Sequence, residues 1–566
     1  MAIESYWTRF QRERISRRRL LGAAGIGAAG LAIAAACGDG DDGGVGDAAT
    51  ATPGAPGAEE TPRAGGILRL RQTIAYPNLS PFEPGLGSLA QGLFTGYTIY
   101  DHLWFVPTDT GEVVPFLADE IEVIDAQTIR VHMGEAVFHD LPPVDGRDVR
   151  SSDVKASLLR FREIPPVGFS WLQEVFERMD TPDDRTVVYH QNRPWAWFFT
   201  ASNAGSPWGS SILPEEVLDD EEIYSNRPIG SGRWVLTEHD NFTNIRLRKF
   251  QNYREPGLPL LDGIDYNFIS DTALALAAFS AKDIDLVLAG SGVTSLDAES
   301  LSDRFGDEVI IDSDLSRSYR VLMIKHEGPF RDERVRHGIN LAINRDEIRQ
   351  AINLGDGQFS GPVPPAHKRF ALDESDPDLQ EYFRHDPADA RAMLEAADFP
   401  FDQEIEIKYA TSSSGISAQL AQVLQQQLSA VGMNVKVPPG EELIRWLTQT
   451  LSPGNFQMTA FTQLPYEDPS LPLSFYLGSE AAAQPNFMGY QDDEVDLAIL
   501  AAAEELDEEL RVEKTKEAQR VIIRKWGPQL TLYSPISFAA RWDYVKGVVT
   551  GRGSFGLFNP RVWLDK

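Results

Sequence analysis

Cysteine is nearly absent from this sequence. The 566 residues include a single one, Cys37, so an internal disulfide and a cluster of thiolate metal ligands are both excluded. The nine histidines are scattered, and the two closest in sequence are His132 and His139. No HExxH and no GxSxG motif occurs, so the patterns typical of zinc proteases and serine hydrolases are missing. The sequence predicts no catalytic residue, no metal site and no cofactor.

Positive charge is scarce as well. Lys and Arg number 52 against 84 Asp and Glu, which gives a net charge of −32 at neutral pH. Residues 1–36 contain six Arg and two Glu, so the remainder carries a net charge near −36. A chain this acidic is a poor partner for nucleic acid. Adjacent carboxylates such as Asp183 and Asp184 are expected by chance in so acidic a sequence, and they indicate solvated surface charge rather than acid–base catalysis.

Apolar runs long enough to span a membrane are missing. The run at residues 20–36 follows three arginines at 17–19 and ends at Cys37, but it is short and rich in Gly and Ala. A basic start, a modest apolar middle and small residues at the end are typical of an export signal. Residues 16–21 resemble the twin-arginine motif, which a receptor reads. Residues 34–37, Ala-Ala-Ala-Cys, resemble the bacterial lipobox, whose cysteine is lipidated.

An uncleaved N-terminal anchor with an unused cysteine is the alternative interpretation of residues 1–36. Both interpretations place the body of the protein outside the cytoplasm. Residues 37–64 are rich in Gly, Ala, Asp, Thr and Pro and nearly free of bulky apolar side chains. Such a segment cannot bury a core, so it is predicted to be a disordered tether.

Mixed strand and helix patterns follow from residue 65 onward, which predicts α/β lobes rather than a repeat array. Strands are expected at 67–71, 128–132, 264–269, 285–288, 530–533 and 544–549. Helices are expected after Ser151 or Ser152 as the N-cap, and at 272–279, 386–397, 416–430, 494–505 and 510–525. Residues 332–352 are expected to form one amphipathic helix, with apolar side chains at helical spacing.

Several segments taken in order resemble the family 5 solute-binding proteins of ABC importers, the group that includes oligopeptide- and dipeptide-binding proteins. The resemblance covers essentially everything from Gly65 to the C-terminus. The matching segments are the strand 128–133 with Phe138-His139-Asp140, Gly230-Ser231-Gly232 before a strand, the arginine-bearing stretch 330–345, the Asp386-Pro387 helix, and Asp468-Pro469. Residues 141–145 stand as an insertion before Gly146.

The resemblance implies a two-lobed, periplasmic-binding-protein-like α/β fold of type II, cluster C, with an extra subdomain in lobe I. Lobe I is expected to comprise residues 65–96, 228–316 and 529–566. The subdomain is expected at 97–227 and lobe II at 317–528. A ligand is expected between lobes that close about hinge strands.

Ligand-binding residues are nominated from aromatic and polar side chains in the regions where the family holds its ligand: Tyr76, Trp208, Trp446, Gln463, Tyr466 and Asp468. Peptide binders of the family place an aspartate shortly before the Asp-Pro, and residues 463–465 here are Gln, Leu and Pro. A peptide therefore stays open beside an oligosaccharide or another polar solute.

The resemblance also implies partners: a peptide or small-molecule ligand, an ABC permease with its ATPase, and a membrane reached through lipidated Cys37. The body is expected to act as a monomer. A sensory or interaction protein that reuses the fold is the alternative function, and a surface enzyme on a similar scaffold is a more distant one.

Overall fold

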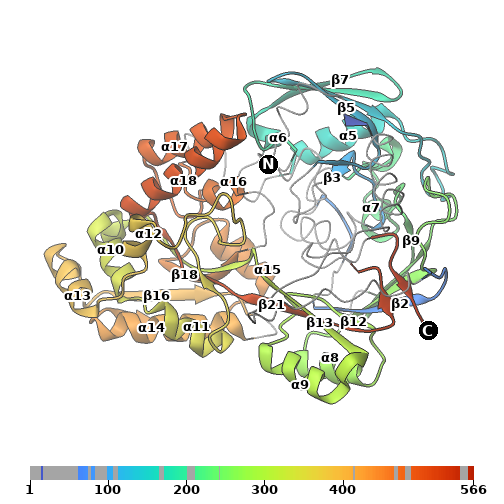
Figure 1. Cartoon of the computed structure of the whole chain (residues 1–566). Coiled ribbons are helices and arrows are strands. Elements are labelled where there is room, and N and C mark those ends of the chain that lie inside the picture. The colour runs from blue at the N-terminus through green and yellow to red at the C-terminus, as the bar shows by residue number, and fades with distance from the viewer. Residues whose placement is uncertain are drawn as a thin grey trace, which may run out of the picture.

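The computed structural model describes residues 15–16, 61–73, 78–82, 98–105, 113–164, 171–199, 211–240, 243–411, 415–463, 469–478, 486–548 and 559–566. Within these ranges the chain forms three larger sheets with helices packed around them (Figure 1). No helix within them is long and apolar enough to cross a membrane.

The first large sheet has seven strands. Its central strand, β2 (Ile67–Gln72), pairs in parallel with β11 (Gly263–Phe268) and with β12 (Leu286–Val287). The alternating side chains of β2 place Leu68 and Leu70 in the core at zero exposure. The outer strands pair antiparallel: β10 (Asn244–Lys249) and β9 (Trp234–Asp240) on one side, β21 (Ile536–Trp542) and β13 (Val309–Leu315) on the other. Helices α8 (Thr272–Ser280) and α9 (Ser295–Phe305) accompany this sheet.

A five-stranded sheet forms the subdomain. Its strands are β5 (Ala118–Asp125), β6 (Thr128–Met133), β8 (Thr186–Gln191) and β7 (Phe176–Asp183), with the short β1 (Ile15–Ser16) paired to β5. The helices of this part are α5 (Ser151–Arg162), α6 (Trp171–Glu174) and α7 (Glu221–Asn226).

The N-cap expected at Ser151 or Ser152 is wrong, because α5 begins one residue earlier and is capped at Arg150. The backbone N–H of Arg150 donates to the Asp153 carboxylate at 2.8 Å, which closes the first turn. The hydroxyl of Ser151 instead donates to the carbonyl oxygen of Asp183 at 2.5 Å. The serine therefore ties the helix to a neighbouring strand.

The third sheet, also five-stranded, forms the core of the second lobe. Its strands in order are β17 (Asn434–Lys436), β16 (Glu404–Tyr409), β18 (Met458–Gln463), β14 (Tyr319–Ile324) and β19 (Gln529–Thr531). The helices of this lobe are α12 (Pro377–Tyr382), α13 (Pro387–Ala396), α14 (Ile416–Ala430), α15 (Leu443–Arg445), α16 (Ser470–Ser474), α17 (Asp493–Glu504) and α18 (Glu508–Arg524), together with the π-helix η5 (Trp446–Leu451).

The single helix expected over residues 332–352 is wrong, because the segment forms α10 (Glu333–Ala342) and α11 (Arg345–Asn353). Ile343 is extended, and the side chain of Asn344 accepts the backbone N–H of Glu347 at 3.0 Å as the N-cap of α11. Arg345 turns inward, and its Nε donates to the Thr531 carbonyl oxygen at 3.0 Å. The break therefore lets a buried arginine reach the sheet.

Two neighbouring segments connect the first sheet to the third. The chain leaves the first sheet after β13 and enters the third sheet at β14. It returns from β19 through β20 (Tyr533–Ser534) to β21. Sheet pairing passes from the third to the first sheet between Thr531 and Ile536. Thr531 is still paired in the third sheet, and Ile536 is already paired in the first, so the chain crosses between the sheets a few residues beyond the expected boundary at 529. The lobe boundaries as a whole stay a prediction.

Candidate functional site

The candidate site lies at one edge of the second lobe's sheet, beside the connecting segments. Here β14 begins and β18 ends, and Tyr319 stands opposite Gln463 in the antiparallel ladder. In the next strand, β19, Gln529 stands opposite Met323, further along β14, but its side chain reaches that of Gln463. This edge therefore brings together side chains from three strands that are far apart in sequence.

Two glutamines form the polar centre of this edge. Gln463 and Gln529 are each 1% exposed, and the Gln463 Nε2 donates to the Gln529 Oε1 at 2.8 Å. The Tyr476 hydroxyl donates to the Gln529 carbonyl oxygen at 2.8 Å, and burial raises the pKa of this tyrosine well above its usual value. Among the described residues, Gln463 Oε1 and Gln529 Nε2 have no hydrogen-bond partner. A buried polar atom left unpaired costs about 1–3 kcal/mol, so these two are suited to meet a polar solute or water.

Trp446 supplies an aromatic wall next to the end of β18. Its side chain is fully buried, and its ring lies 4.9 Å from that of Phe461 at an interplanar angle of 31°. Both belong to an apolar cluster with Tyr319 and Met323 of β14. Within the part of the chain that the structure describes, the indole Nε1 has no hydrogen-bond partner. Trp446 is thus part of the core and also holds an unused donor.

Arg320 is a buried cation in the same region that the sequence analysis missed. It is 7% exposed, and its Nη1 donates to the Thr462 hydroxyl at 2.6 Å. Among the described residues its Nε has no hydrogen-bond partner, and no carboxylate there lies within ion-pair distance of Arg320. Burial raises the pKa of the nearby Tyr533, and Arg320 acts in the opposite direction. The one signal in sequence is a charge inside the otherwise apolar run of β14.

The nominated residues fall into two groups. Trp446 and Gln463 lie at this edge, as described above. Tyr76, Trp208, Tyr466 and Asp468 lie outside the described residues, as does Cys37. The ligand contacts of all six nominated residues stay predictions.

The potential metal ligands among the described residues are dispersed. No group of three or more His, Cys, Asp and Glu side chains is arranged there to hold a metal ion. His132 is exposed on β6, whereas His139 is fully buried and contacts the Gly232 carbonyl oxygen through Nε2 at 3.0 Å. Burial lowers the pKa of His139 to about 4, so its imidazole is neutral at pH 7. These contacts point to a structural role for His139.

Comparison with known proteins shows which family the sequence matches. The sequence profile of the bacterial extracellular solute-binding proteins, family 5 Middle, matches residues 112–484. Di/tripeptide-binding protein 2 of Pseudomonas aeruginosa is 25% identical over 482 residues, which is 80% of this chain and 87% of that protein. Heme-binding protein A of Haemophilus influenzae is 23% identical over 492 residues, covering 81% of this chain and 86% of that protein.

Solved structures share the fold. The periplasmic binding protein DppA of Helicobacter pylori, in complex with the peptide STSA, superposes with a TM-score of 0.76 at 23% identity. The match covers 89% of this chain and 99% of DppA. The likeness confirms the predicted two-lobed α/β fold.

Proposed function

Because the chain belongs to the bacterial extracellular solute-binding proteins of family 5, we propose that it binds one solute between its lobes and delivers it to the permease of an ABC importer. The observation that carries the proposal is the match of the family profile to residues 112–484. The two adjacent connections between the sheets support it, because paired connections of this kind can serve as a hinge. The protein holds and releases its solute without chemical change.

A peptide or a similar polar solute fits the candidate site best. Gln463 and Gln529 offer one free acceptor and one free donor, Trp446 offers a free indole N–H, and Arg320 offers a guanidinium without a carboxylate partner. Similar proteins carry names that refer to di- and tripeptides and to heme. Residues 463–465 are Gln, Leu and Pro where peptide binders of the family place the aspartate that pairs with a peptide's α-amino group, so a blocked peptide or an oligosaccharide is the second candidate.

Solutes carried through purification identify the ligand class most directly. The full chain is purified without denaturation, and the released solutes are analysed by mass spectrometry. A thermal-shift screen over peptides, oligosaccharides and chelated metals follows. A true ligand at a hundredfold excess over its dissociation constant stabilises the fold by about 2.7 kcal/mol. A hit that is consumed over time, or that binds without compaction of the protein in scattering, contradicts the proposal.

The proposal extends to the cell surface. Cys37 would be lipidated after export, and residues 37–64 would act as a tether. One acyl chain anchors a protein only marginally, so stable anchoring requires more than one. Replacing the cysteine (Cys37→Ser) should release the protein from membranes or block its processing. Membrane retention with normal cleavage in this variant contradicts the anchor. Replacing the arginines at 17 and 18 with lysine tests the twin-arginine route, because that receptor reads the arginines themselves.

Delivery to an importer implies a membrane partner. We expect the monomeric, ligand-bound protein to associate with a permease that is coupled to an ATPase. Ligand-dependent stimulation of ATP hydrolysis by the reconstituted transporter measures this association. A sensory protein would instead bind its solute without any effect on a transporter's ATPase.

A further inference from the structure

The segment that follows β8 contacts the second lobe directly. The backbone N–H of Ala196 donates to the Ala503 carbonyl oxygen at 2.8 Å. The rings of Trp197 and Phe370 meet edge to face with centroids 5.3 Å apart, and the Arg511 guanidinium carbon lies 4.9 Å from the Trp197 ring centroid. The side chain of Trp197 is only 3% exposed. It is therefore enclosed by groups from the second lobe.

On its own side, Trp197 is followed directly along the chain by Phe198 and Phe199, which belong to an aromatic cluster of the subdomain. The neighbouring Phe198 lies 5.2 Å from Trp171 and 5.4 Å from Trp104, measured between ring centroids. The Trp104 Nε1 donates to the Phe199 carbonyl oxygen at 3.0 Å. Trp197 must therefore move together with the subdomain.

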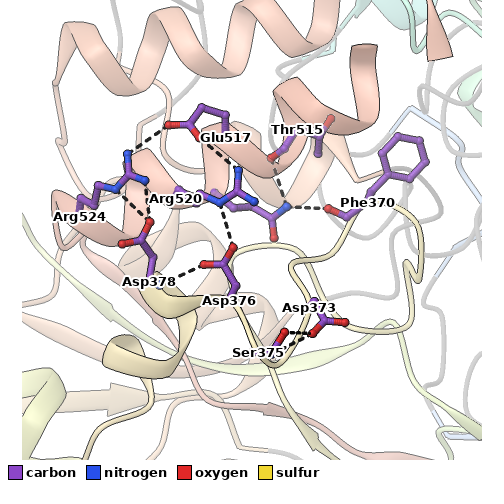
Figure 2. Close-up of polar contacts among 10 residues, drawn as sticks. Phe370, Asp373, Ser375, Asp376, Asp378, Thr515, Glu517, Arg520 and Arg524 are labelled. Atoms are coloured by element: carbon purple, nitrogen blue, oxygen red, sulfur yellow. Dashed lines mark hydrogen bonds and ion pairs between the residues drawn. The ribbon is translucent and has the colours of Figure 1, made fainter. Parts of the chain in front are cut away.

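On the other side, Phe370 is fixed to α18. Its carbonyl oxygen accepts a hydrogen bond from the Gln519 Nε2 at 2.7 Å, and Figure 2 shows Phe370 near Thr515 of this helix. A few residues further along the same loop, Asp376 forms an ion pair with Arg520 at 2.9 Å. Arg369 also pairs with Glu508 and Glu509. Phe370 therefore moves as part of the second lobe.

The contact lies away from the strands that connect the lobes. In Figure 1, β21 crosses low in the view, whereas α17, which carries Ala503, lies high. A rotation of one lobe about the connecting strands displaces this contact more than any group near them. Ring contacts lose much of their attraction within about 1 Å of separation, so opening the lobes must break this contact.

We propose that Trp197 is a positioning residue for solute binding: it seats between Phe370 and Arg511 when the lobes are closed and favours the closed arrangement. The inference rests on the proposed function, because it is lobe closure that encloses the solute. All of these contacts join protein groups, so they act with or without a solute. An aromatic pair of this kind shifts the closed-to-open ratio by about two- to tenfold.

A distance measurement across the two lobes tests the proposal without any ligand. In the full chain carrying Cys37→Ser, spin labels are placed at Glu177→Cys on β7 and Glu513→Cys on α18, both at exposed positions. Pulsed electron resonance then gives the distribution of label distances. The parent should show a measurable short-distance population beside a longer one, and Phe370→Ala and Trp197→Ala should each lower the ratio of short to long distances about two- to tenfold.

Phe401→Ala is the matched control, since Phe401 is a half-buried phenylalanine of the same lobe that packs on Phe399 and Arg391. It should leave the distribution unchanged. The Phe370→Ala variant keeps the test valid if Trp197→Ala fails to fold, because Phe370 is half-buried on a loop. A parent with no short-distance population at all, or a folded Phe370→Ala protein with the parent's distribution, overturns the proposal. Because no solute is added, these outcomes do not depend on whether the proposed ligand class is right.

Discussion

The backbone N–H of Ser316 donates to the carbonyl oxygen of Pro535 at 2.9 Å, where the two connections between the lobes run side by side. Leu315 pairs with Ile536 on the first-sheet side of this bond, and Val321 pairs with Thr531 on the other. The two segments therefore form a continuous antiparallel ribbon from one sheet to the next. A paired ribbon can bend while it limits independent movement of either segment. The proposed closure of the two lobes over a solute requires this kind of connection.

Gly357 lies against this ribbon, which gives a first prediction. A Cβ at Gly357 would lie 2.4 Å from the Ser534 carbonyl oxygen, and the residue has φ of +113°. Gly357→Ala should therefore destabilise the protein by about 2–5 kcal/mol and weaken solute binding, since the ribbon must shift. Urea unfolding and calorimetric titration measure the two effects.

Gly257→Ala is the matched control for that prediction. Gly257 also has a positive φ, +81°, but a Cβ there would meet nothing within 4 Å. Its replacement should cost about 1–2 kcal/mol through backbone strain alone and leave affinity unchanged. Equal losses of stability in the two variants would show that the ribbon tolerates the extra methyl group.

The helices were the best predicted part of the fold, because their signals are local. Asp386 and Pro387 predicted the start of α13, and the carboxylate of Asp386 does accept the Asp389 N–H at 3.0 Å. The break between α10 and α11 was missed, since it depends on Arg345 reaching the Thr531 carbonyl oxygen from far away in sequence. Apolar spacing alone continues smoothly through that point.

Strand β21 and the polar site also depend on residues far apart in the sequence, which limits their prediction from sequence. The sequence of β21 lacks clear alternation, and its partners β12 and β13 lie more than 200 residues earlier, as the pairing of Ile311 with Ala540 illustrates. Gln463 and Trp446 were nominated from a family resemblance. Gln529 and Arg320 were missed because only the folded sheet places them beside those residues.

A second prediction concerns the glutamine pair. Gln463→Leu removes the 2.8 Å bond to Gln529 and leaves Gln529 buried without this partner, so stability should fall by about 1–3 kcal/mol. Affinity for a polar solute should fall about tenfold, since the Gln463 Oε1 is lost as an acceptor. Gln425→Leu serves as the control. Gln425 lies on α14, and its Nε2 donates to the Val435 carbonyl oxygen of β17 at 3.0 Å, so this variant should alter stability only. Unchanged affinity in Gln463→Leu removes this residue from the site.

A third prediction separates the two roles of Trp446. Trp446→Phe keeps an aromatic ring on Phe461 and deletes an indole N–H that has no protein partner. If that N–H donates to the solute, affinity should fall by about three- to tenfold with only a modest loss of stability. Trp542→Phe is the control: its buried Nε1 donates to the Ile284 carbonyl oxygen at 3.2 Å, so it should lose stability and keep affinity. Unchanged affinity in Trp446→Phe would assign this residue to packing alone.

The last prediction concerns stability in acid. Burial lowers the pKa of His139 from 6.5 to about 4, although the hydrogen bond to Gly232 acts in the opposite direction. Between these values the unfolded chain takes up a proton that the folded protein does not. The contribution of neutral His139 to the free energy of unfolding is therefore fully present above about pH 6.5 and is lost as the pH falls from there through 4. The loss reaches about 3 kcal/mol at pH 4.

The His139→Gln variant isolates this effect from the many carboxylates that also titrate in acid. The free energy of unfolding, measured in urea at pH 7, 5.5 and 4, should fall less steeply in the variant, with about 3 kcal/mol less loss between the extremes. His132→Gln, at an exposed position on β6, removes an imidazole without touching the core and should retain the parent's slope. If His139→Gln also retains that slope, the buried imidazole is already protonated or reaches water in the folded protein, and the neutral structural role assigned to it is wrong.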